Sequence, residues 1–378
     1  MMKVMHILGN FGPGGAEMGV VRLIRSFQSD DIIHSVCSIS SNTLLKELLP
    51  DGTNLYTLGI EGACYTAFSS LLRLFKKTKT DIAHVNNLAP WFDVALGSKL
   101  AGCKCIETFH GIEEKLIKFP VWRRGLLRTA CALSTRVTAV SESSKDLLVE
   151  LSGIKKHEIE VIPNGVDTDI FCPPLSYDDK KQIRANLNLP EDRFLIGCVS
   201  ALRPVKGHEG LMRAFALFLS NNRDSAVHEN ANLVLVGDGP LFSELRIFSR
   251  QLGIEDKVVF MGRRNDVQDI LRAIDVFVLN SETEGMSYAV LEAMSSGLPV
   301  IASAVGANIE LVNHGAEGYL VSHGDVESLA GYVIKLGNDE SLLSKMGKNA
   351  REKIIKAYSL GKMVSSYKDL YREFYCGN

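Results

Sequence analysis

Residues 276–294 read Val276-Phe277-Val278-Leu279-Asn280-Ser281-Glu282-Thr283-Glu284-Gly285-Met286-Ser287-Tyr288-Ala289-Val290-Leu291-Glu292-Ala293-Met294, a stretch that passes from strand to helix. Its apolar, β-branched run ends near Leu279, a loop containing Gly285 follows, and a helical pattern begins near Met286. Such strand–loop–helix steps recur along the chain. Strands that alternate with helices predict βαβ units, in which helices cover both faces of a parallel sheet.

The alternation falls into two series, which indicates two doubly wound α/β domains of similar size. The first series has expected strands at Val4–Leu8, Ser35–Ile39, Ile82–Val85, Cys105–Phe109 and Val137–Val140. The second has expected strands at Phe194–Ser200, Asn232–Val236, Val258–Met261, Val276–Leu279 and Pro299–Ala302. We therefore expect an N-terminal domain over 1–170, a linker over 171–192, a C-terminal domain over 193–358, and a helix over 359–378 that crosses back to the first domain.

The composition restricts the classes of protein to which the chain can belong. A content of 46% hydrophobic and 23% charged residues excludes a disordered chain. The 42 basic and 44 acidic residues leave a net charge of −2, so no global field recruits nucleic acid. No run approaches the roughly 18 apolar residues of a membrane-spanning helix, and the apolar run before Gly9 is too short for a secretion signal. We expect a soluble, cytoplasmic protein.

The loop and helix of 276–294 form a candidate anion site. The backbone N–H groups of Met286, Ser287 and Tyr288 would be free at the helix N-terminus, where phosphate binds readily. Glu284 lies beside that terminus, and Glu292 lies roughly 10 Å further along the helix. One carboxylate would flank the phosphate site at a sugar, and the other would reach ribose hydroxyls. Spacing alone also allows both to be surface charges of the helix.

This segment resembles the signature of the family-4 retaining glycosyltransferases, two glutamates separated by seven residues, in enzymes with the two-Rossmann GT-B fold. The resemblance covers nearly the whole chain, through Gly14-Gly15-Ala16-Glu17, Pro163-Asn164-Gly165-Val166-Asp167, Val236-Gly237-Asp238-Gly239-Pro240, Phe260-Met261-Gly262-Arg263, the segment 292–303 and Val305-Gly306-Ala307-Asn308-Ile309-Glu310. It implies transfer of a sugar, with retention, from a nucleotide-diphosphate donor to a hydroxyl acceptor in polysaccharide, glycolipid or glycoconjugate assembly. A UDP-sugar donor is favoured, and no metal or other cofactor is expected.

The resemblance also implies roles for individual residues in the donor site. Glu292 would bind the ribose, and Glu284 would hold the donor sugar as a catalytic residue. A side chain at Gly15 would collide with the diphosphate, so its glycine lets the backbone approach. The full set of expected donor-binding residues is Gly15, Gly237, Gly262, Arg263, Gly285, Met286, Ser287, Tyr288 and Glu292.

Three other residues complete the expected catalytic set. Lys206 corresponds to a phosphate-binding lysine of the family. The arginine that the family commonly carries five positions earlier is replaced by Ala201, so we expect Arg203 to substitute for it. His110 matches a histidine that contacts the donor sugar, and Asn86, where the family often has a second histidine, is a weaker candidate for an acceptor contact. Each of these residues also has a purely structural interpretation, as a surface or buried polar group.

Signatures of other cofactors do not fit. Gly9–Gly15 has the wrong spacing for the glycine fingerprint of a dehydrogenase, and the sequence has neither a P-loop nor a His-Glu-x-x-His zinc motif. Asp167-Thr168-Asp169 has the pattern of a metal–diphosphate motif but lies in the segment between the two series. We therefore expect cationic side chains and a helix dipole to take the place of a metal, as the family implies.

One span indicates a partner. Lys115–Ser141 contains no acidic residue and has six basic ones, which are Lys115, Lys118, Arg123, Arg124, Arg128 and Arg136. Apolar residues lie between them, as in a basic amphipathic element that binds anionic membrane. Similar relatives with lipid-linked acceptors use this region against membranes, which would place the protein peripherally at the inner face of the cell membrane. The alternative is a solvated helix with leucines that face the core.

Two other functions remain open at this point. Nucleotide-sugar 2-epimerases share the expected fold and would bind the same donor, although the segment around Glu284 and Glu292 resembles the transferases more. A non-catalytic nucleotide-sugar-binding protein is the second alternative. The expected partners are a nucleotide-sugar donor and a glycan or lipid-linked acceptor.

Overall fold

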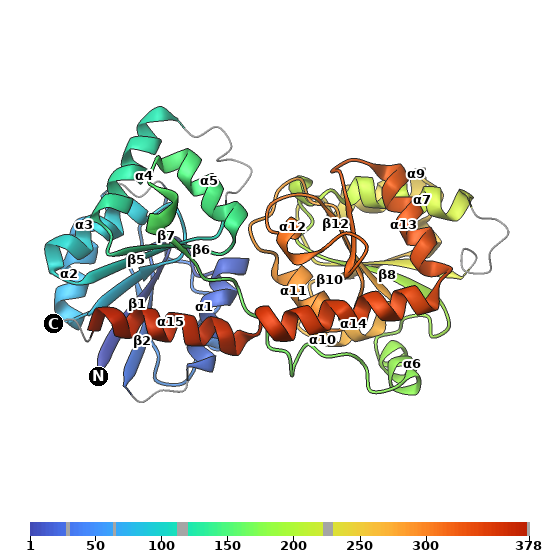
Figure 1. The fold of residues 1–378 in the computed structure, drawn as a ribbon, viewed down its shortest axis with the longest axis horizontal. Coiled ribbons are helices and arrows are strands. Elements are labelled where there is room, and N and C mark those ends of the chain that lie inside the picture. The colour runs from blue at the N-terminus through green and yellow to red at the C-terminus, as the bar shows by residue number, and fades with distance from the viewer. Residues whose placement is uncertain (28–30, 63–65, 112–119, 222–229, 376–378) are drawn as a thin grey trace. The chain divides into compact units, whose positions relative to one another are not determined.

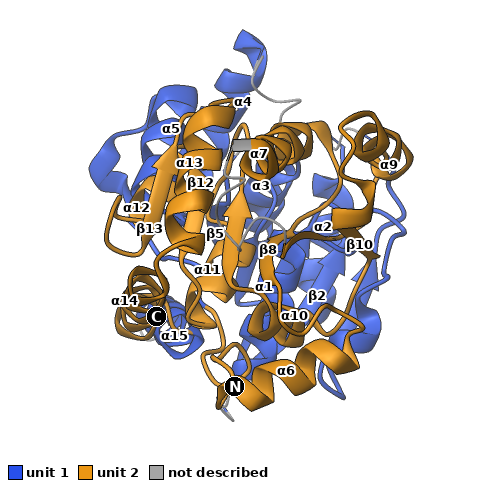
Figure 2. Ribbon diagram, turned by 90° about the vertical axis from the view of Figure 1, so that its right-hand side faces the viewer, with its two compact units in different colours: residues 1–165, 360–378 blue, residues 166–359 orange. Residues whose placement is uncertain are grey.

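The computed structural model describes residues 1–27, 31–62, 66–111, 120–221 and 230–375 (Figure 1). The chain divides into two compact units, unit 1 with Met1–Gly165 and Leu360–Asn378, and unit 2 with Val166–Ser359 (Figure 2). Each unit is built on a parallel sheet with helices on both faces, which confirms the predicted α/β class. None of the helices in the described part of the chain has the length and apolarity needed to span a membrane.

Unit 1 has a seven-stranded sheet in the order β3-β2-β1-β4-β5-β6-β7. Its strands are β1 (Met2–Leu8), β2 (Ile32–Ser38), β3 (Asn54–Thr57), β4 (Ile82–Val85), β5 (Lys104–Phe109), β6 (Arg136–Ala139) and β7 (Ile159–Val161). Strands β1 and β4 pair in parallel at the centre of the sheet, where Val4 of β1 lies opposite Ile82 of β4. All four residues of β4 are buried, as in a parallel strand covered on both faces.

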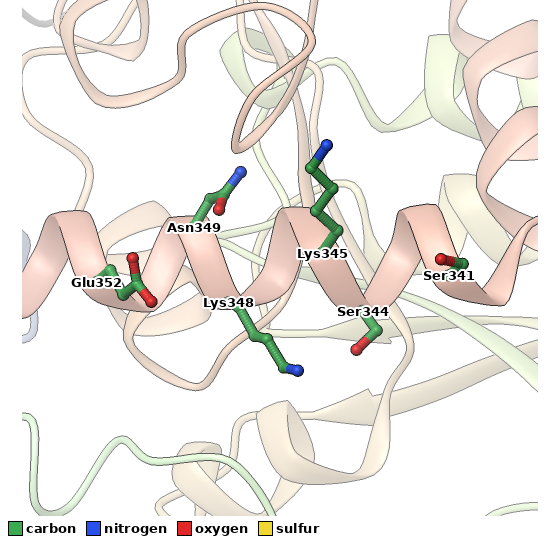
Figure 3. A pocket seen from close by; sticks show the side chains of 6 residues that line it. All are labelled: Ser341, Ser344, Lys345, Lys348, Asn349 and Glu352. Atoms are coloured by element: carbon green, nitrogen blue, oxygen red, sulfur yellow. The ribbon is translucent and has the colours of Figure 1, made fainter.

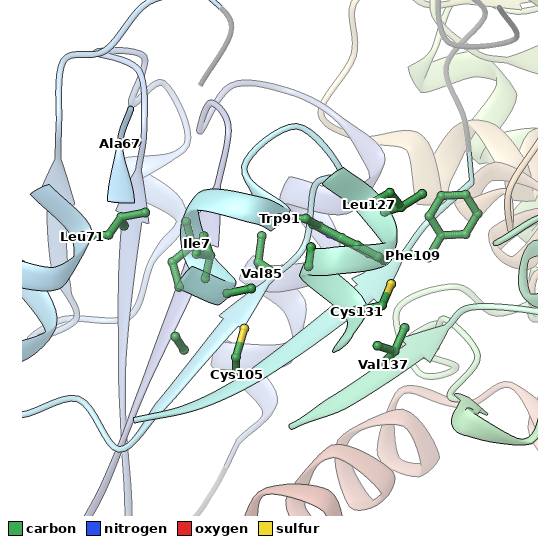
Figure 4. Packing of buried hydrophobic residues seen from close by; sticks show 14 of the residues in the cluster. Ile7, Ala67, Leu71, Val85, Trp91, Cys105, Phe109, Leu127, Cys131 and Val137 are labelled. Carbon is green, nitrogen blue, oxygen red and sulfur yellow. The ribbon is translucent and has the colours of Figure 1, made fainter. Parts of the chain in front are cut away.

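Helices cover unit 1 in two layers. One face of the sheet carries α2 (Phe68–Thr78), α3 (Trp91–Ala101), α4 (Val121–Leu133) and α5 (Glu142–Ser152). The other face carries α1 (Gly15–Ser26) and α15 (Leu360–Tyr375), and short turns η1 (Lys46–Leu48) and η3 (Lys156–Glu158) complete the unit. In the core beneath α3 and α4, Trp91 meets Phe109 edge to face with ring centroids 6.1 Å apart (Figure 4).

The face beneath α15 is partly polar. His84 of β4 bonds through Nδ1 to the Tyr371 hydroxyl at 2.7 Å and through Nε2 to the Thr108 hydroxyl at 2.7 Å. His6 Nε2 lies 3.0 Å from His34 Nδ1 on the neighbouring strand. Burial lowers the pKa of His34 to about 4 and of His84 to about 3, and it lowers the pKa of His6 well below its usual value. These imidazoles are therefore neutral at pH 7.

Unit 2 has a six-stranded parallel sheet in the order β10-β9-β8-β11-β12-β13. Its strands are β8 (Phe194–Val199), β9 (Ala231–Val236), β10 (Val258–Gly262), β11 (Val276–Leu279), β12 (Val300–Ser303) and β13 (Gly318–Val321). Strands β11 and β12 are buried throughout, which matches their continuous apolar runs in the sequence. Strand order reverses direction beside β8, the position where open α/β sheets bind ligands.

The helices of unit 2 also form two layers (Figure 1). One layer contains α7 (His208–Asn221), α9 (Phe242–Gln251) and α13 (Val326–Gly337). The other contains α6 (Tyr177–Asn186), α10 (Val267–Ala273), α11 (Tyr288–Ser295) and α14 (Glu340–Ala357). Shorter turns are η4 (Pro204–Lys206), η5 (Glu255–Lys257) and α12 (Asn308–Leu311).

The segment 171–192, which we expected to be a linker, contains α6 and belongs to unit 2. Ser176 caps α6 by accepting a hydrogen bond from the Asp179 backbone N–H at 3.1 Å. Arg184 is buried and donates to the Ala273 carbonyl oxygen at 2.7 Å and to Asp275 at 2.8 Å. These bonds join α6 to the end of α10 and to the turn that follows it, so the polar composition of the segment reflects a paired surface helix and not a free connector.

Candidate active site

The loops that follow the strands of unit 2 bring most of the predicted donor residues to one edge of its sheet. In a parallel sheet the carboxyl ends of all strands share an edge. The loop after β8 carries Lys206, the loop after β11 carries Glu284, Gly237 directly follows β9, and β10 ends at Gly262.

Lys206 and Glu284 form the central contact of the edge. The Lys206 Nζ lies 2.6 Å from Glu284 Oε1, and the Ser281 hydroxyl donates to the same oxygen at 2.7 Å. The Glu284 side chain is only 8% exposed and that of Lys206 23%, so water screens this pair poorly. Two residues predicted to act on one donor are thus in direct contact.

Backbone contacts on both sides of Lys206 fix the geometry of this pair. The Glu282 N–H donates to the Val205 carbonyl oxygen at 2.8 Å. Asn280 Nδ2 donates to the Gly207 carbonyl oxygen at 3.2 Å, and a Cβ on Gly207 would overlap the Asn280 backbone. A residue with a side chain would force the two loops apart at that point, so the glycine is needed for their close approach.

The helix behind Glu284 begins two residues later than predicted. Helix α11 starts at Tyr288, and Ser287 is its N-cap, with its hydroxyl accepting from the Val290 N–H at 3.5 Å. The first helical bond runs from Leu291 N–H to the Ser287 carbonyl oxygen, so the amides of Tyr288 and Ala289 precede the helical ladder. The N-terminus of α11 therefore lies at Tyr288 and Ala289, and Met286, which we expected to contribute an amide there, is buried in the preceding loop.

Glu292 lies on α11, and it is 6% exposed. A surface charge on a helix would be far more exposed, so the structure removes the alternative that Glu292 is only a solvated surface residue. The Ser296 hydroxyl donates to the Glu292 backbone oxygen at 2.9 Å, and Glu292 also interacts with other residues. A carboxylate this buried is normally paired in a folded protein.

Gly237 and Gly262 meet at the ends of β9 and β10. The Gly237 N–H donates to the Gly262 carbonyl oxygen at 2.9 Å. Gly237 has φ +138° and a Cβ there would overlap the Ser200 carbonyl oxygen, whereas Gly262, with φ +63°, faces open space. Gly237 is thus required for packing between loops, and Gly262 leaves room beside the exposed Arg263.

Arg203 is exposed, and no ion pair or side-chain hydrogen bond joins it to another residue in the described ranges. It is the N-cap of η4, three residues before Lys206. The structure therefore places Arg203 on the loop that we expected, but it does not bring its guanidinium to the Lys206–Glu284 pair.

His208 is a member of this edge that the sequence reasoning missed. It is buried, and its Nε2 lies 2.9 Å from the Ser200 hydroxyl. Burial, reinforced by the Lys206 charge, lowers the pKa of His208 to about 4, so the imidazole is neutral beside the lysine. Its position two residues after Lys206 was the only signal for it in the sequence.

The corresponding edge of unit 1 contains Gly15 and His110. Gly15 is the first residue of α1, and a Cβ on its N-cap Gly14 would overlap the Glu17 carboxylate. Asn87 donates to Glu17 at 3.2 Å and accepts from the Gly9 N–H at 2.9 Å. The glycine loop is therefore fixed by an amide–carboxylate pair.

His110 directly follows β5, where the sequence predicted it. Its Nε2 is inaccessible to water and has no hydrogen-bond partner among the described residues. Burial lowers the pKa of His110 to about 4, so the ring is neutral at pH 7. Asn86, the weaker candidate for an acceptor contact, is 4% exposed and donates to the His84 carbonyl oxygen at 3.2 Å, which gives it a structural role.

The basic span of unit 1 is described only in part, because Lys115, Lys118 and the rest of 112–119 lie outside the described residues. Residues Val121–Leu133 of the span form α4, with Val121 and Trp122 85% and 55% exposed, whereas Arg136 lies in β6 and pairs with Glu373 at 2.6 Å. Arg123 lies over the Trp122 ring at 5.2 Å, and Arg124 and Arg128 are exposed. Leu127 faces the core. Helix α4 is thus amphipathic, with basic and apolar groups on its exposed side.

The acidic motif in the segment between the two series and a pocket on α14 lie apart from the predicted donor residues. The described residues contain no group of three or more His, Cys, Asp or Glu side chains that could hold a metal ion. Asp167 accepts from the Asp169 and Ile170 N–H groups, so Asp167-Thr168-Asp169 forms a turn. A pocket on α14 is lined by Ser341, Ser344, Lys345, Lys348, Asn349 and Glu352 and contains no predicted donor residue (Figure 3).

Comparison with known proteins connects this geometry to a family. Residues 13–170 match "Glycosyltransferase Family 4" and residues 179–353 match "Glycosyl transferases group 1". The UDP-Gal:α-D-GlcNAc-diphosphoundecaprenol α-1,3-galactosyltransferase of Escherichia coli is 32% identical over 80% of this chain and 78% of its own. The N-acetyl-α-D-glucosaminyl L-malate synthase of Bacillus anthracis is 31% identical over 80% of this chain and 77% of its own.

A solved structure agrees at the level of the fold. Anabaena HepE in complex with UDP has a TM-score of 0.82, with 22% identity over 99% of this chain and 100% of that chain. The sucrose-phosphate synthase of Thermosynechococcus elongatus has a TM-score of 0.81, with 21% identity over all of both chains. The chain has two parallel-sheet units, a lysine–glutamate pair at a sheet edge, and relatives that align with most of its length. It therefore belongs to the group 1, family-4 glycosyltransferases, with the GT-B fold.

Proposed function

We propose that this glycosyltransferase moves a sugar, with retention of its anomeric configuration, from a UDP-sugar to a hydroxyl group of a lipid-linked glycan. The observation that carries the proposal is the Lys206–Glu284 contact of 2.6 Å, close in sequence to the N-terminus of α11. At one edge of the unit 2 sheet, this pair provides a cation for a departing diphosphate and a carboxylate for sugar hydroxyls. The buried Glu292 supplies the ribose contact on the same helix.

The expected chemistry needs stabilisation of negative charge on the leaving diphosphate. Lys206 and the backbone N–H groups at the N-terminus of α11 are preorganised donors of the kind that stabilises such charge without reorganisation. No side chain in the family signature is an obvious nucleophile. We therefore propose attack on the same face through an oxocarbenium-like state, with the leaving phosphate accepting the acceptor's proton, and with no metal requirement.

The donor and acceptor classes rest on the relatives. The E. coli relative has a UDP-galactose donor and an undecaprenol-linked acceptor in its name, and HepE was solved with UDP. The B. anthracis relative has L-malate in its name, so acceptors differ within the family. The exposed Val121, Trp122 and arginines of α4 favour an acceptor presented at a membrane surface, because they match a basic amphipathic surface element. We propose peripheral association with the inner face of the cell membrane.

A donor screen tests this proposal. Purified protein is incubated with UDP-, GDP- and ADP-sugars, with and without a polyprenyl-diphosphate-linked sugar and with EDTA throughout, and products are resolved by chromatography and NMR. We expect transfer from a UDP-sugar, with an α-donor giving an α-linkage. An epimerised sugar released from UDP-sugar alone would establish the 2-epimerase alternative, and UDP-sugar binding without turnover across the panel would indicate a non-catalytic protein.

A further inference from the structure

Two residues outside the expected donor site determine where the Glu284 carboxylate can lie. We propose that Ser281 and Gly306 are positioning residues, which hold Glu284 against Lys206 through one side-chain hydrogen bond and one close backbone contact. The inference rests on the proposed function of that pair in donor binding. Ser281 lies in the segment 276–294 and Gly306 in the matching stretch 305–310, but neither was assigned a role from the sequence.

Ser281 acts on the Glu284 side chain. It is fully buried, and its hydroxyl donates to Glu284 Oε1 at 2.7 Å, the same oxygen that contacts Lys206 Nζ at 2.6 Å. A carboxylate oxygen with two fixed donors loses most of its rotational freedom. Hydrogen bonds to charged groups are also the stronger ones in proteins. Ser281 therefore selects one rotamer of Glu284 and leaves Oε2 to face other partners.

Ser281 is itself fixed by the next strand. The Ser303 hydroxyl, at the end of β12, donates to the Ser281 carbonyl oxygen at 2.6 Å, and Asn308 Nδ2 donates to the Ser303 carbonyl oxygen at 3.0 Å. All three residues are fully buried. The loop after β11 is thus supported by groups from the loop after β12, and a disturbance in one is transmitted to the other.

Gly306 acts on the Glu284 backbone. It has φ +50°, and a Cβ built on it would overlap the Glu284 carbonyl oxygen and approach the Gly285 carbonyl oxygen at 3.3 Å. Beside it, the Ala307 N–H donates to the Gly285 carbonyl oxygen at 3.0 Å. The absence of a side chain at Gly306 therefore lets the loop after β12 lie directly against the peptide that carries Glu284.

The experiment compares two positioning variants with two matched controls. Gly306→Ala is paired with Gly324→Ala, which also has positive φ (+84°) but has no atom within 4 Å of its Cβ position. Ser281→Ala is paired with Ser295→Ala, whose buried hydroxyl donates to the Phe171 carbonyl oxygen at 2.6 Å in the same unit. Turnover with UDP-sugar, the Kd for UDP and the melting temperature are measured for all four.

We expect Gly306→Ala to lower kcat about 100-fold, since a misplacement of about 1 Å in a catalytic group costs that much. Ser281→Ala should lower kcat about tenfold, the effect of one hydrogen bond to a charged group. The Kd for UDP should change less than about threefold in both. The controls should keep wild-type kcat even where their melting temperatures fall.

A double variant separates positioning from general loosening of the fold. If Ser281 acts through the Lys206–Glu284 pair, Ser281→Ala should have little further effect on kcat in a Lys206→Ala background. Multiplicative effects, or equal losses of kcat in the variants and their controls, would overturn the positioning role. A wild-type protein that neither binds UDP nor turns over any donor would instead overturn the proposed function, and UDP binding by the wild type keeps the two outcomes apart.

Discussion

The two units share the order of six parallel strands, to which unit 1 adds a seventh, but they build the carboxyl edges of their sheets differently. In unit 2 the loops after β8, β11 and β12 are joined by a half-buried ion pair and by backbone contacts that only glycines permit. In unit 1 the loops after β1 and β4 are joined by the Asn87 amide, which bonds both Gly9 and Glu17. The same strand order can therefore carry a lysine–glutamate ion pair at one edge and an amide–carboxylate contact with a neutral imidazole at the other. We infer that the donor diphosphate is stabilised mainly by unit 2.

The sharpest test of this comparison is Lys206→Ala. It removes the cation that contacts Glu284 at 2.6 Å, and we expect turnover to fall about 100-fold, or about 3 kcal/mol of transition-state stabilisation. UDP affinity should fall less, because the charge matters most on the departing diphosphate. Steady-state kinetics and calorimetry with UDP measure both. Lys345→Ala, an exposed change on α14, is the control, and an unchanged turnover in Lys206→Ala would contradict the role.

Arg203→Ala run beside it tests the substitution that we predicted for the family arginine. Since Arg203 is exposed and makes no described contact with the pair, its loss should cost less than the loss of Lys206. A loss as large as that of Lys206 would show that Arg203 reaches the donor after all.

The second test divides the acidic residues of unit 2 into two roles. Glu292→Gln should weaken free UDP about 30-fold, because a buried carboxylate that accepts from ribose hydroxyls is lost. Glu284→Gln should reduce turnover by a similar factor and leave free UDP nearly unaffected. Calorimetry with UDP and with UDP-sugar distinguishes them. Equal losses of UDP in both variants would show that the edge binds the nucleotide as one unit.

The third test concerns unit 1 and its exposed helix α4. The triple change of Arg123, Arg124 and Arg128 to Ser should weaken binding to anionic vesicles about tenfold, since each basic residue near the surface contributes up to roughly 1 kcal/mol. UDP affinity should not change. The matched control changes Lys76, Lys77 and Lys79, three exposed lysines of unit 1, to Ser. Equal loss in both triples would indicate unspecific charge attraction, and a wild type that ignores anionic vesicles at low salt would end the membrane proposal.

The fourth test uses the buried histidines of unit 1. Burial places the folded-state pKa of His34 at about 4 and of His84 at about 3, below the unfolded value of about 6.5. Between those pKa values the unfolded chain binds more protons than the folded chain does. The free energy of unfolding is therefore highest above about pH 6.5 and falls as pH drops toward 4. Tyr367 and Tyr371 of α15 face this cluster, and Arg372 pairs with Asp31 at 2.7 Å.

Urea unfolding followed by tryptophan fluorescence reports on unit 1 alone, since both tryptophans, Trp91 and Trp122, belong to it. His34→Gln removes one titrating group and should flatten the dependence of unfolding free energy on pH by about 1 kcal/mol per pH unit between pH 6 and pH 5. The exposed His314→Gln in unit 2 is the control. A slope that His34→Gln leaves unchanged would mean that the cluster does not govern acid stability.

The fold could be predicted because it depends on local patterns, whereas parts of the site depend on contacts between strands distant in sequence. Alternating apolar runs and helical patterns indicated both sheets, the loop before α11 indicated a site at Glu284, and the family resemblance implied Lys206. The contacts of Ser281 with Ser303 and of Gly306 with Glu284 join loops about 20 residues apart, and no local pattern reports them.

The prediction of a linker over 171–192 was wrong for a different reason. The two prolines Pro173 and Pro174 and the polar composition favoured a linker, yet Ser176 with Asp179 three residues later is an N-cap signature that indicated the start of α6. The partner that buries Arg184 is Asp275, which lies 91 positions away in sequence. Composition alone could not reveal that pairing.

The place of α15 in unit 1 has a consequence for synthesis of the chain. Tyr371 is fully buried in one core with Met2, Val4 and Ile106. The central strands of unit 1 therefore lack the cover that α15 gives to one face of the sheet until residues 360–375 have left the ribosome. Unit 2, although encoded later than most of unit 1, is contiguous and completes first. During translation the first unit to begin is therefore the last to finish. A nascent or truncated chain that ends before Leu360 would expose the apolar and histidine-lined face of that sheet to chaperones and proteases.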